Sequence, residues 1–128
     1  ICFLRKRFYE VAMDKTIKEL AVELTVEITE ITDKIKGRTV FVNQLLRACS
    51  SIGANSYEAK YAQSTADFVS KLEISLKECY ETQYWLELLL NSDLIDDSAF
   101  TSLNEDLKEI IAMITSSIRT VKRAENNL

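Results

Sequence analysis

The chain has 128 residues, of which 47% are hydrophobic and 28% are charged, and its formal net charge is −4. This length suits one domain, so we predict a single domain over residues 1–128. The charged content argues against a membrane-embedded protein, and the apolar content argues against a disordered one. Proline is absent and glycine occurs twice, whereas globular chains average about 5% and 7% of these residues. The shortage of turn-forming residues favours long helices.

The first predicted helix extends from about Tyr9 to Ile35. Its apolar residues recur at spacings of three and four and form one stripe, which consists of Met13, Ile17, Leu20, Leu24, Ile28, Ile31 and Ile35. Gly37 is expected to supply a left-handed cap at the end of this helix, and Thr39 to cap the start of the next. These residues predict a short connection between the two helices.

The second predicted helix extends from about Val40 to Tyr61, and its expected core side consists of Val42, Leu45, Leu46, Cys49, Ile52 and Ser56. Nearly every side chain from Ala48 to Ser56 is small, which lets the backbones of neighbouring helices come close. Gly53 in this stretch should cost about 1 kcal/mol relative to alanine, a penalty that is tolerable where glycine permits a close contact. We therefore expect other helices to surround this one.

The third predicted helix extends from about Thr65 to Leu90, after a Ser64–Asp67 pair that resembles a capping box. Its expected core positions are Phe68, Leu72, Leu76, Cys79, Gln83, Leu86 and Leu90. A polar connection leads to the fourth predicted helix, from about Ser98 to Arg123. Its heptad seam consists of Phe100, Leu103, Leu107, Ile110, Ile114, Ser117 and Val121. Four such helices predict an all-α, antiparallel up-down-up-down four-helix bundle.

One side of the second helix lies away from its main core stripe and carries Arg47, Ser51, Ala54 and Glu58. One interpretation is a solvent-exposed face. The other is a helix packed on two sides, in which Arg47 pairs with a carboxylate such as Glu78 or Glu81 of the third helix or of another subunit. The small residues on this side favour the second interpretation.

The sequence offers no reaction centre. It has no histidine, which excludes a Glu-x-x-His metal site and a conventional catalytic triad. Its two glycines are too few for a phosphate-cradling loop. The first helix carries carboxylates at a spacing typical of a solvated face, namely Glu19, Glu23, Glu27 and Glu30. We therefore expect no enzymatic activity, and no catalytic, cofactor-binding or metal site.

An aromatic group, Tyr80, Tyr84 and Trp85, lies beside the acidic residues Glu81 and Glu87. Aromatic platforms that stack nucleic-acid bases normally lie in positive grooves. Packing in the core or at a subunit interface is therefore the favoured role of this group.

Charge is unevenly distributed along the chain. Residues 73–109 carry ten acidic residues against two lysines, and residues 34–60 carry five basic residues against one glutamate. An acidic body is a poor general binder of nucleic acid, although a local basic patch could contact phosphates. The candidate patch consists of Lys34, Lys36, Arg38, Arg119, Lys122 and Arg123.

Cys2, Cys49 and Cys79 make an odd number of cysteines without a Cys-x-x-Cys spacing. Cys49 and Cys79 fall on apolar helical positions, where a small buried hydrophobe is the favoured role. A reducing cytoplasm is therefore the simplest location for the protein.

Two segments of the chain resemble a known family. The run from Leu45 to Glu58 is similar to the second-helix signature of four-helix-bundle proteins encoded in 23S rRNA intervening sequences. The run from Ser64 to Leu72 resembles the third helix of the same family, as do the later groups Leu76-Lys77-Glu78, Glu81-Thr82 and Tyr84-Trp85-Leu86. The similarity extends from about Val11 to Lys122.

The resemblance implies a bacterial protein that folds as a left-handed four-helix bundle, assembles as a homopentamer and has no known enzymatic activity. Family features that map onto this chain are expected to serve packing and subunit contact, and they are Arg47, Ser51, Asn55, Glu58, Asp67, Lys77 and Glu78. A related branch comprises the accessory variability proteins of diversity-generating retroelements. These proteins use a basic pentameric surface to engage nucleic acid and a reverse transcriptase.

Two hypotheses follow for the function. The first is a non-enzymatic homo-oligomeric scaffold for protein interactions, with interface or packing residues Arg47, Ser51, Ala54, Asn55, Glu58, Lys77, Glu78 and Glu81. The second is an accessory factor that binds RNA, DNA or a reverse transcriptase through basic patches. The acidic body favours the first hypothesis, and neither involves a membrane.

Overall fold

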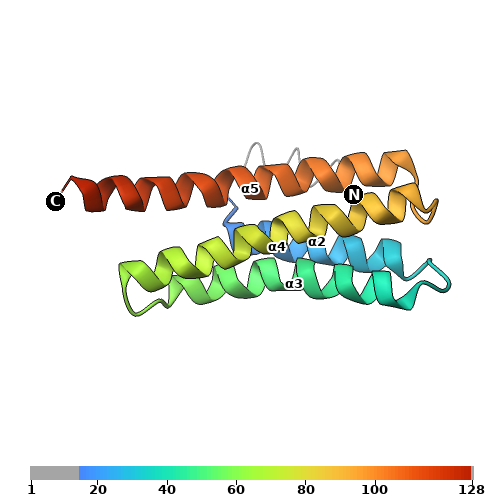
Figure 1. Cartoon of the computed structure of the whole chain (residues 1–128), viewed down its shortest axis with the longest axis horizontal. Coiled ribbons are helices and arrows are strands. Elements are labelled where there is room, and N and C mark those ends of the chain that lie inside the picture. Colours follow the sequence, from blue (N-terminus) through green and yellow to red (C-terminus); the bar gives the residue numbers. More distant parts are fainter. Residues whose placement is uncertain (1–14, 128) are drawn as a thin grey trace.

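Four helices make up the described part of the chain, residues 15–127 of a computed structural model, and no strand occurs within it. They are α2 (Ile17–Thr32), α3 (Thr39–Lys60), α4 (Thr65–Asn91) and α5 (Asp97–Asn126). The α2–α3 and α4–α5 connections lie at one end and the α3–α4 connection at the other, so consecutive helices run in opposite directions (Figure 1). Each helix packs against two neighbours, in the cyclic order α2, α3, α4, α5. The predicted all-α four-helix bundle is confirmed.

The start of α2 differs from the prediction. Thr16 is its N-cap, and the Thr16 hydroxyl accepts a hydrogen bond from the Glu19 backbone N–H at 3.1 Å. The Glu19 carboxylate accepts in return from the Thr16 N–H at 3.4 Å, which completes a capping box. Lys15 and Thr16 are therefore not helical, and the predicted residues 9–14 lie outside the described part of the chain. The sequence contains the Thr16–Glu19 capping pair. The prediction missed this helix start because apolar residues continue at helical spacing on both sides of it, at Met13 and Ile17.

The α2–α3 connection also differs from the prediction. α2 ends at Thr32, and Gly37 has the expected positive φ, +80°, but lies within the connection rather than at the end of the helix. Arg38 follows with φ 52° and is the N-cap of α3, without a side-chain hydrogen bond to the helix. The predicted capping by Thr39 is wrong, because Thr39 is the first helical residue. Two successive left-handed residues turn the chain here, and glycine adopts that conformation at little cost.

α2 and α3 come close together at Gly53. A Cβ atom at this position would lie 3.3 Å from the Cβ of Ala21 on α2. Thr25 bridges the same contact, because its hydroxyl donates to the Ala21 carbonyl at 2.8 Å and also lies 3.3 Å from the Cys49 carbonyl of α3. The expectation that Gly53 permits a close helix contact is confirmed.

α3 and α4 meet through small hydroxyl side chains. Ser75 is fully buried, and its hydroxyl donates to the Ile52 carbonyl at 2.9 Å and lies 2.8 Å from the hydroxyl of Ser56. Thr82, also fully buried, donates to the Glu78 carbonyl of its own helix at 2.8 Å. Because these hydroxyls are hydrogen-bonded, their burial carries little penalty. They occupy less space than leucine and let the two helices approach.

The buried stripe of α4 therefore differs from the predicted one. It runs through Leu72, Ser75, Cys79, Thr82, Leu86 and Leu89. The predicted core positions Phe68, Leu76, Gln83 and Leu90 are half-buried instead. The apolar pattern did not include Ser75 and Thr82 because both residues are polar. Both nevertheless lie at the spacing of three and four that a core stripe requires.

The stripe of α5 follows the prediction until near its end. Leu103, Leu107, Ile110 and Ile114 are buried, and the next buried residue is Ile118 rather than the predicted Ser117. A straight helix drifts away from a strict heptad because it has 3.6 residues per turn, so a step of four replaces a step of three. Among the described residues, no helix is both long and apolar enough to cross a bilayer.

Cys49 and Cys79 are fully buried free thiols in the core. Burial raises the pKa of Cys49 to about 11 and that of Cys79 to about 12. Both thiols are therefore protonated at neutral pH and act as small hydrophobic side chains, as predicted. Cys2 lies outside the described residues.

Candidate interaction surfaces

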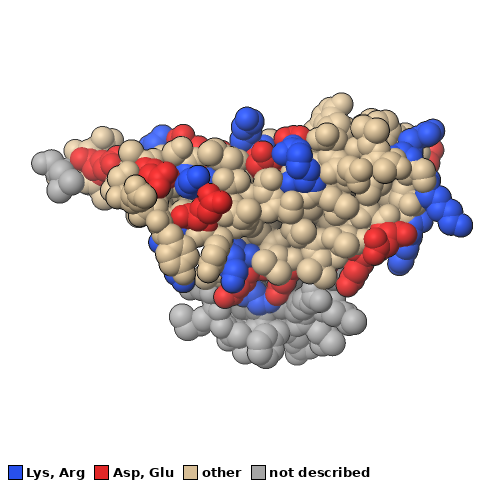
Figure 2. Space-filling view, turned by 90° about the horizontal axis from the view of Figure 1, so that it is seen from below, with Lys and Arg blue, Asp and Glu red and all other residues tan. Residues whose placement is uncertain are grey.

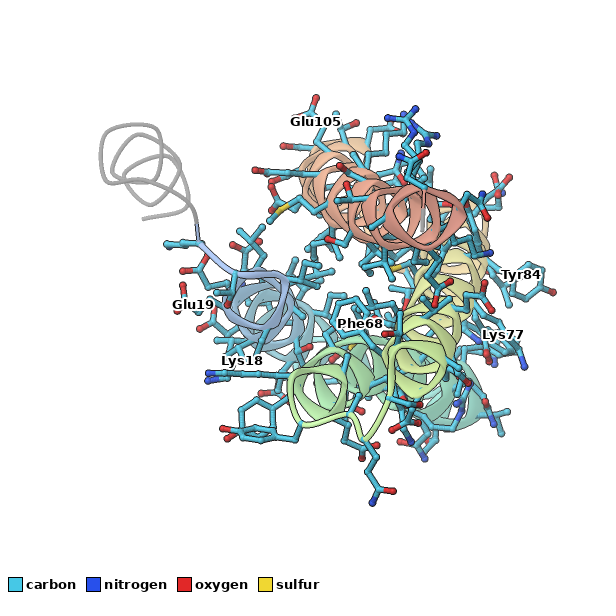
Figure 3. All side chains as sticks on the ribbon, turned by 90° about the vertical axis from the view of Figure 1, so that its left-hand side faces the viewer. Lys18, Glu19, Phe68, Lys77, Tyr84 and Glu105 are labelled. Atoms are coloured by element: carbon cyan, nitrogen blue, oxygen red, sulfur yellow. The ribbon has the colours of Figure 1, made fainter. Side chains whose placement is uncertain are left out.

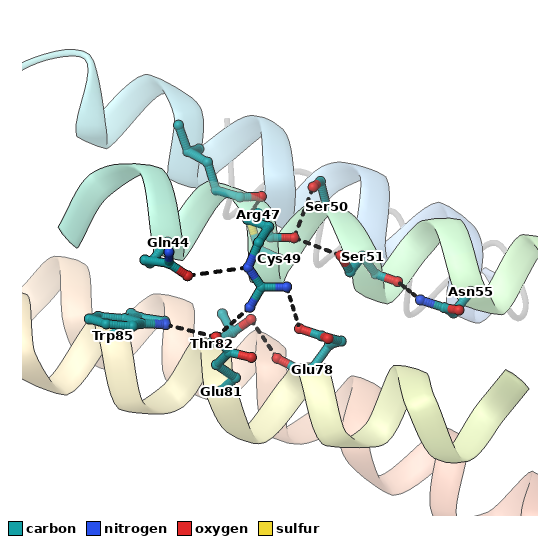
Figure 4. Close-up of polar contacts among 11 residues, drawn as sticks. Gln44, Arg47, Cys49, Ser50, Ser51, Asn55, Glu78, Glu81, Thr82 and Trp85 are labelled. Atoms are coloured by element: carbon teal, nitrogen blue, oxygen red, sulfur yellow. Dashed lines mark hydrogen bonds and ion pairs between the residues drawn. The ribbon is translucent and has the colours of Figure 1, made fainter. Parts of the chain in front are cut away.

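A polar cluster on the outside of the bundle joins α3 to α4. Arg47 Nη1 donates to Glu78 Oε2 at 3.4 Å, and Arg47 Nη2 donates to Glu81 Oε1. Arg47 Nε donates to Gln44 Oε1 at 3.2 Å, and Trp85 Nε1 donates to the same Glu81 oxygen at 3.2 Å (Figure 4). Both predicted carboxylate partners of Arg47 are therefore engaged within one chain.

The cluster keeps contact with solvent in the single chain. The Arg47 side chain is 46% exposed, whereas that of Glu78 is 12% exposed and that of Glu81 is 31% exposed. The hydrogen bond from Arg47, and secondly that from Trp85, holds the pKa of Glu81 below its ordinary value. In the single chain, Arg47 thus bridges two carboxylates of α4 and keeps its contact with solvent.

The Arg47–Glu81 pair should make stability depend on pH. Because the folded-state pKa of Glu81 is lowered from 4.5, its contribution is fully present above the unfolded-state pKa and is lost as pH falls through the folded-state pKa. At this exposure we expect about 0.2–1 kcal/mol. Urea unfolding should show Glu81→Gln to be less stable than wild type near pH 7, with a smaller difference near pH 3. Glu87→Gln, an exposed control on the same helix, should show no such change, and an equal Glu81→Gln difference at both pH values would contradict the assignment.

The other predicted interface residues have separate surroundings. The Ser51 hydroxyl donates to the Arg47 carbonyl and the Asn55 amide donates to the Ser51 carbonyl, each at 2.8 Å, so both bond back to α3. Glu58 forms an ion pair at 3.0 Å with Lys71 of α4, a partner that the sequence did not indicate. Two further residues of the predicted set, Ala54 and Lys77, are exposed. Contact between copies of the chain through these residues stays a prediction.

An apolar groove of about 310 Å³ lies between α2 and α3. None of the described residues that line it is charged, and they are Ala21, Val22, Thr25, Val26, Thr29, Ser50, Gly53 and Ala54. Val22 is 50% exposed and Val26 is 42% exposed. The sequence interpretation missed both valines because they lie beside the main apolar stripe of α2. Their spacing of four, next to Thr25 and Thr29, is the signal that could have identified this second face.

The predicted nucleic-acid patch is not one surface. Its first half, Lys34, Lys36 and Arg38, lies in the α2–α3 connection, whereas its second half lies on the last turns of α5 at the opposite end (Figure 1). That second half consists of Arg119, Lys122 and Arg123, and Lys122 forms an ion pair with Glu73 at 3.2 Å. Seen from below, basic and acidic side chains are mixed along the molecule around a continuous uncharged area (Figure 2). A prediction based on residue type could not show this separation.

The three aromatic residues of α4 differ in their burial. Trp85 is half-buried and packs against Phe41 of α3, with ring centroids 6.4 Å apart, and against Tyr84 at 5.0 Å. Tyr80 and Tyr84 are 54% and 58% exposed. Packing within the chain therefore holds for Trp85, while a subunit-interface role for the tyrosines stays a prediction. Across residues 15–127, no group of three or more acidic or cysteine side chains is placed to hold a metal ion.

Comparisons with known proteins cover most of this bundle. Residues 13–116 match the family model described as 23S rRNA-intervening sequence protein. The chain is also similar to a crystal structure of a protein with unknown function from the S23 ribosomal protein family of Bacteroides thetaiotaomicron. The two are 41% identical with a TM-score of 0.75, over 80% of this chain and 98% of that chain. No curated protein matches the sequence.

Proposed function

Because the chain belongs to the 23S rRNA-intervening sequence protein family, we propose that it acts by assembly rather than by catalysis. In this proposal the bundle forms a homo-oligomer, with the pentamer that the family resemblance implies, and the assembled surface is a non-enzymatic scaffold for other proteins. The observation that carries the proposal is the uncharged groove between α2 and α3. The two buried free thiols support a reducing bacterial cytoplasm as the location.

The groove has the properties of a helix-docking surface. Val22 and Val26 expose apolar area at its rim, and burying such side chains is favourable by roughly 25 cal/mol per Å². On the α3 side, Ser50, Gly53 and Ala54 are small, so an approaching helix finds no bulky side chain in its way. An uncharged lining is unusual in a chain of which 28% is charged, and it favours contact with another apolar surface over contact with water.

Charge supports a second copy of the chain as the occupant. The segment 34–60, which contains α3, has an excess of basic residues, whereas the segment 73–109 has ten acidic residues against two lysines. Three of these basic residues, Lys34, Lys36 and Arg38, lie in the α2–α3 connection, and we expect them to attract acidic residues of α4 or α5 in a second copy, which is a contact between two different surfaces. Such heterologous contacts close into rings when the rotation between copies permits it. A cyclic pentamer is an assembly of this kind.

Sedimentation velocity tests the assembly. Wild type at micromolar concentration is expected to sediment as an oligomer, and Ala54→Trp as a species of 14.6 kDa. Ala54 is exposed in the single chain, so the indole should block the groove while the helical circular dichroism is preserved. The matched control is Ala112→Trp, at an exposed position of α5, which should still assemble. A wild type that sediments only as a monomer would refute assembly, and an oligomeric Ala54→Trp would remove the groove from the interface.

One observation favours a second function, association with nucleic acid. Lys18 and Lys60 lie beside two exposed tyrosines near the end of α3, away from the acidic residues that flank Tyr80 and Tyr84. The patch predicted from the sequence does not support this function by itself, because it is divided between the two ends of the bundle. Binding of a labelled, unstructured oligoribonucleotide, measured by fluorescence anisotropy, tests the second function.

A further inference from the structure

Two exposed tyrosines and two lysines gather where α3 ends. Tyr57 is 45% exposed and Tyr61 is 64% exposed, and their ring centroids lie 5.3 Å apart in an edge-to-face arrangement. The Nζ atom of Lys18 lies 5.3 Å from the Tyr57 ring centroid, and that of Lys60 lies 5.8 Å from the Tyr61 ring centroid. Tyr57 and Lys60 lie three residues apart on α3, and Tyr61, the C-cap residue of this helix, lies four residues after Tyr57, so the three fall on the same side. Lys18 joins them from the first turn of α2.

A cleft of about 340 Å³ adjoins this group. Phe68 and Leu72 of α4 contribute apolar side chains to its lining, which also includes Lys18, Tyr57 and Lys60. Figure 3 views the bundle from this end and places Phe68 between the helices and Lys18 at the outer side of α2. The site therefore combines an apolar recess with exposed rings and two ammonium groups.

Two acidic groups near the site have partners of their own, and a third, Glu125, lines a neighbouring pocket together with Lys60. Glu19 accepts the Thr16 N–H in the capping box of α2, and Glu58 pairs with Lys71 at 3.0 Å. Lys18 and Lys60 form no ion pair with any residue between 15 and 127. The hydrogen bond with Tyr61 is the main cause that raises the pKa of Tyr57 above its ordinary value. The Tyr57 phenol is therefore neutral at physiological pH and adds no negative charge.

We propose that this group is a binding site for unpaired nucleic acid, in which a base stacks on Tyr57 or Tyr61 and Lys18 and Lys60 contact the flanking phosphates. Exposed aromatic rings next to cations are the means by which many proteins hold single strands without reading their sequence. The inference deepens the second function proposed above and rests on it. It assigns that function to residues outside the patch predicted from sequence. Tyr84 lies on the opposite side of the bundle (Figure 3), and no lysine of residues 15–127 lies over its ring as Lys18 and Lys60 lie over those of Tyr57 and Tyr61.

Fluorescence anisotropy with a labelled, unstructured oligoribonucleotide tests the site. Wild type is expected to bind at low salt and to lose affinity steeply between about 50 and 200 mM salt. Tyr57→Ala should weaken binding about tenfold without altering the salt dependence. Tyr57→Phe, which keeps an aromatic ring, should bind with the affinity of wild type. Lys18→Gln and Lys60→Gln should each reduce the slope of log affinity against log salt by about 0.7.

Matched variants on the opposite side of the bundle are the controls. Tyr84→Ala and Lys77→Gln replace exposed residues of the same types and should bind like wild type, and circular dichroism should confirm that every variant is folded. If wild type fails to bind at low salt, both the second function and this site are wrong. If wild type binds but Tyr57→Ala and Lys18→Gln bind equally well, the second function stands and this site is wrong. Equal affinity for duplex and single-stranded RNA would also overturn base stacking at this site.

Discussion

Replacing Leu107 with alanine is expected to lower the free energy of unfolding by about 2–5 kcal/mol. Leu107 is fully buried in the middle of the α5 stripe, and α5 packs against both α4 and α2. The truncation removes apolar contacts and leaves a cavity that rigid helices fill only in part. Because domains are typically stable by about 5–15 kcal/mol, this loss would be a large fraction of the total. Urea unfolding followed by circular dichroism measures it.

The neighbouring residue is the control for this experiment. Lys108 is exposed on the same helix, so Lys108→Ala should change the free energy of unfolding by no more than about 0.5 kcal/mol. If the two variants unfolded at the same urea concentration, Leu107 would not lie in the core of the folded protein.

Replacing Ser75 with leucine is expected to cost about 2–4 kcal/mol of folding free energy. The leucine would overfill the contact between α3 and α4, which costs about 1–3 kcal/mol. It would also remove the hydroxyl that bonds the Ile52 carbonyl at 2.9 Å, a loss of about 1 kcal/mol. The prediction runs against the usual preference of a core for apolar side chains. Urea unfolding measures this loss as a lower midpoint concentration, with the slope of the unfolding free energy against urea concentration unchanged.

Two further variants separate the causes. Ser75→Ala keeps the small size and loses only the hydrogen bonds, so it should cost about 1 kcal/mol. Ser70→Leu places the same leucine at an exposed position of α4 and should be close to neutral. A Ser75→Leu variant more stable than Ser75→Ala would show that α3 and α4 have room between them, contrary to the structure.

The close contacts of α3 position both candidate surfaces. On one side, Gly53 brings α3 against Ala21 of α2, and the groove opens directly above this contact. On the other side, the Ser56–Ser75 contact holds α3 against α4, beside the helix turns that carry Tyr57 and Tyr61. Because the backbones are held by buried contacts, the exposed residues on the helices, such as Lys18 and Tyr57, keep fixed mutual positions. This rigidity suits a surface that binds partners.

The candidate surfaces were only partly predictable. The pairing of Arg47 with Glu78 and Glu81 was predictable, because a lone arginine among small residues needs a carboxylate and α4 supplies two at adjacent turns. The grouping of Lys18 with Tyr57 was not, because the two residues lie on different helices and no sequence pattern connects them. The division of the basic patch could not be predicted either, because it depends on which end of the bundle holds the α2–α3 connection and which end holds the last turns of α5.

The sequence by itself determined the four helices of residues 15–127 and most of the buried stripes of α2 and α5, since helical periodicity and the absence of proline are local properties of the chain. Only the tertiary structure decided that Ser75 and Thr82 belong to the core. The Ser75 hydroxyl bonds a carbonyl of the facing helix, whereas the Thr82 hydroxyl bonds a carbonyl of its own helix. Which of these small side chains is buried depends on where the facing helix comes close. The same long-range packing exposed Val22 and Val26 beside Gly53 and brought Lys18 to Tyr57.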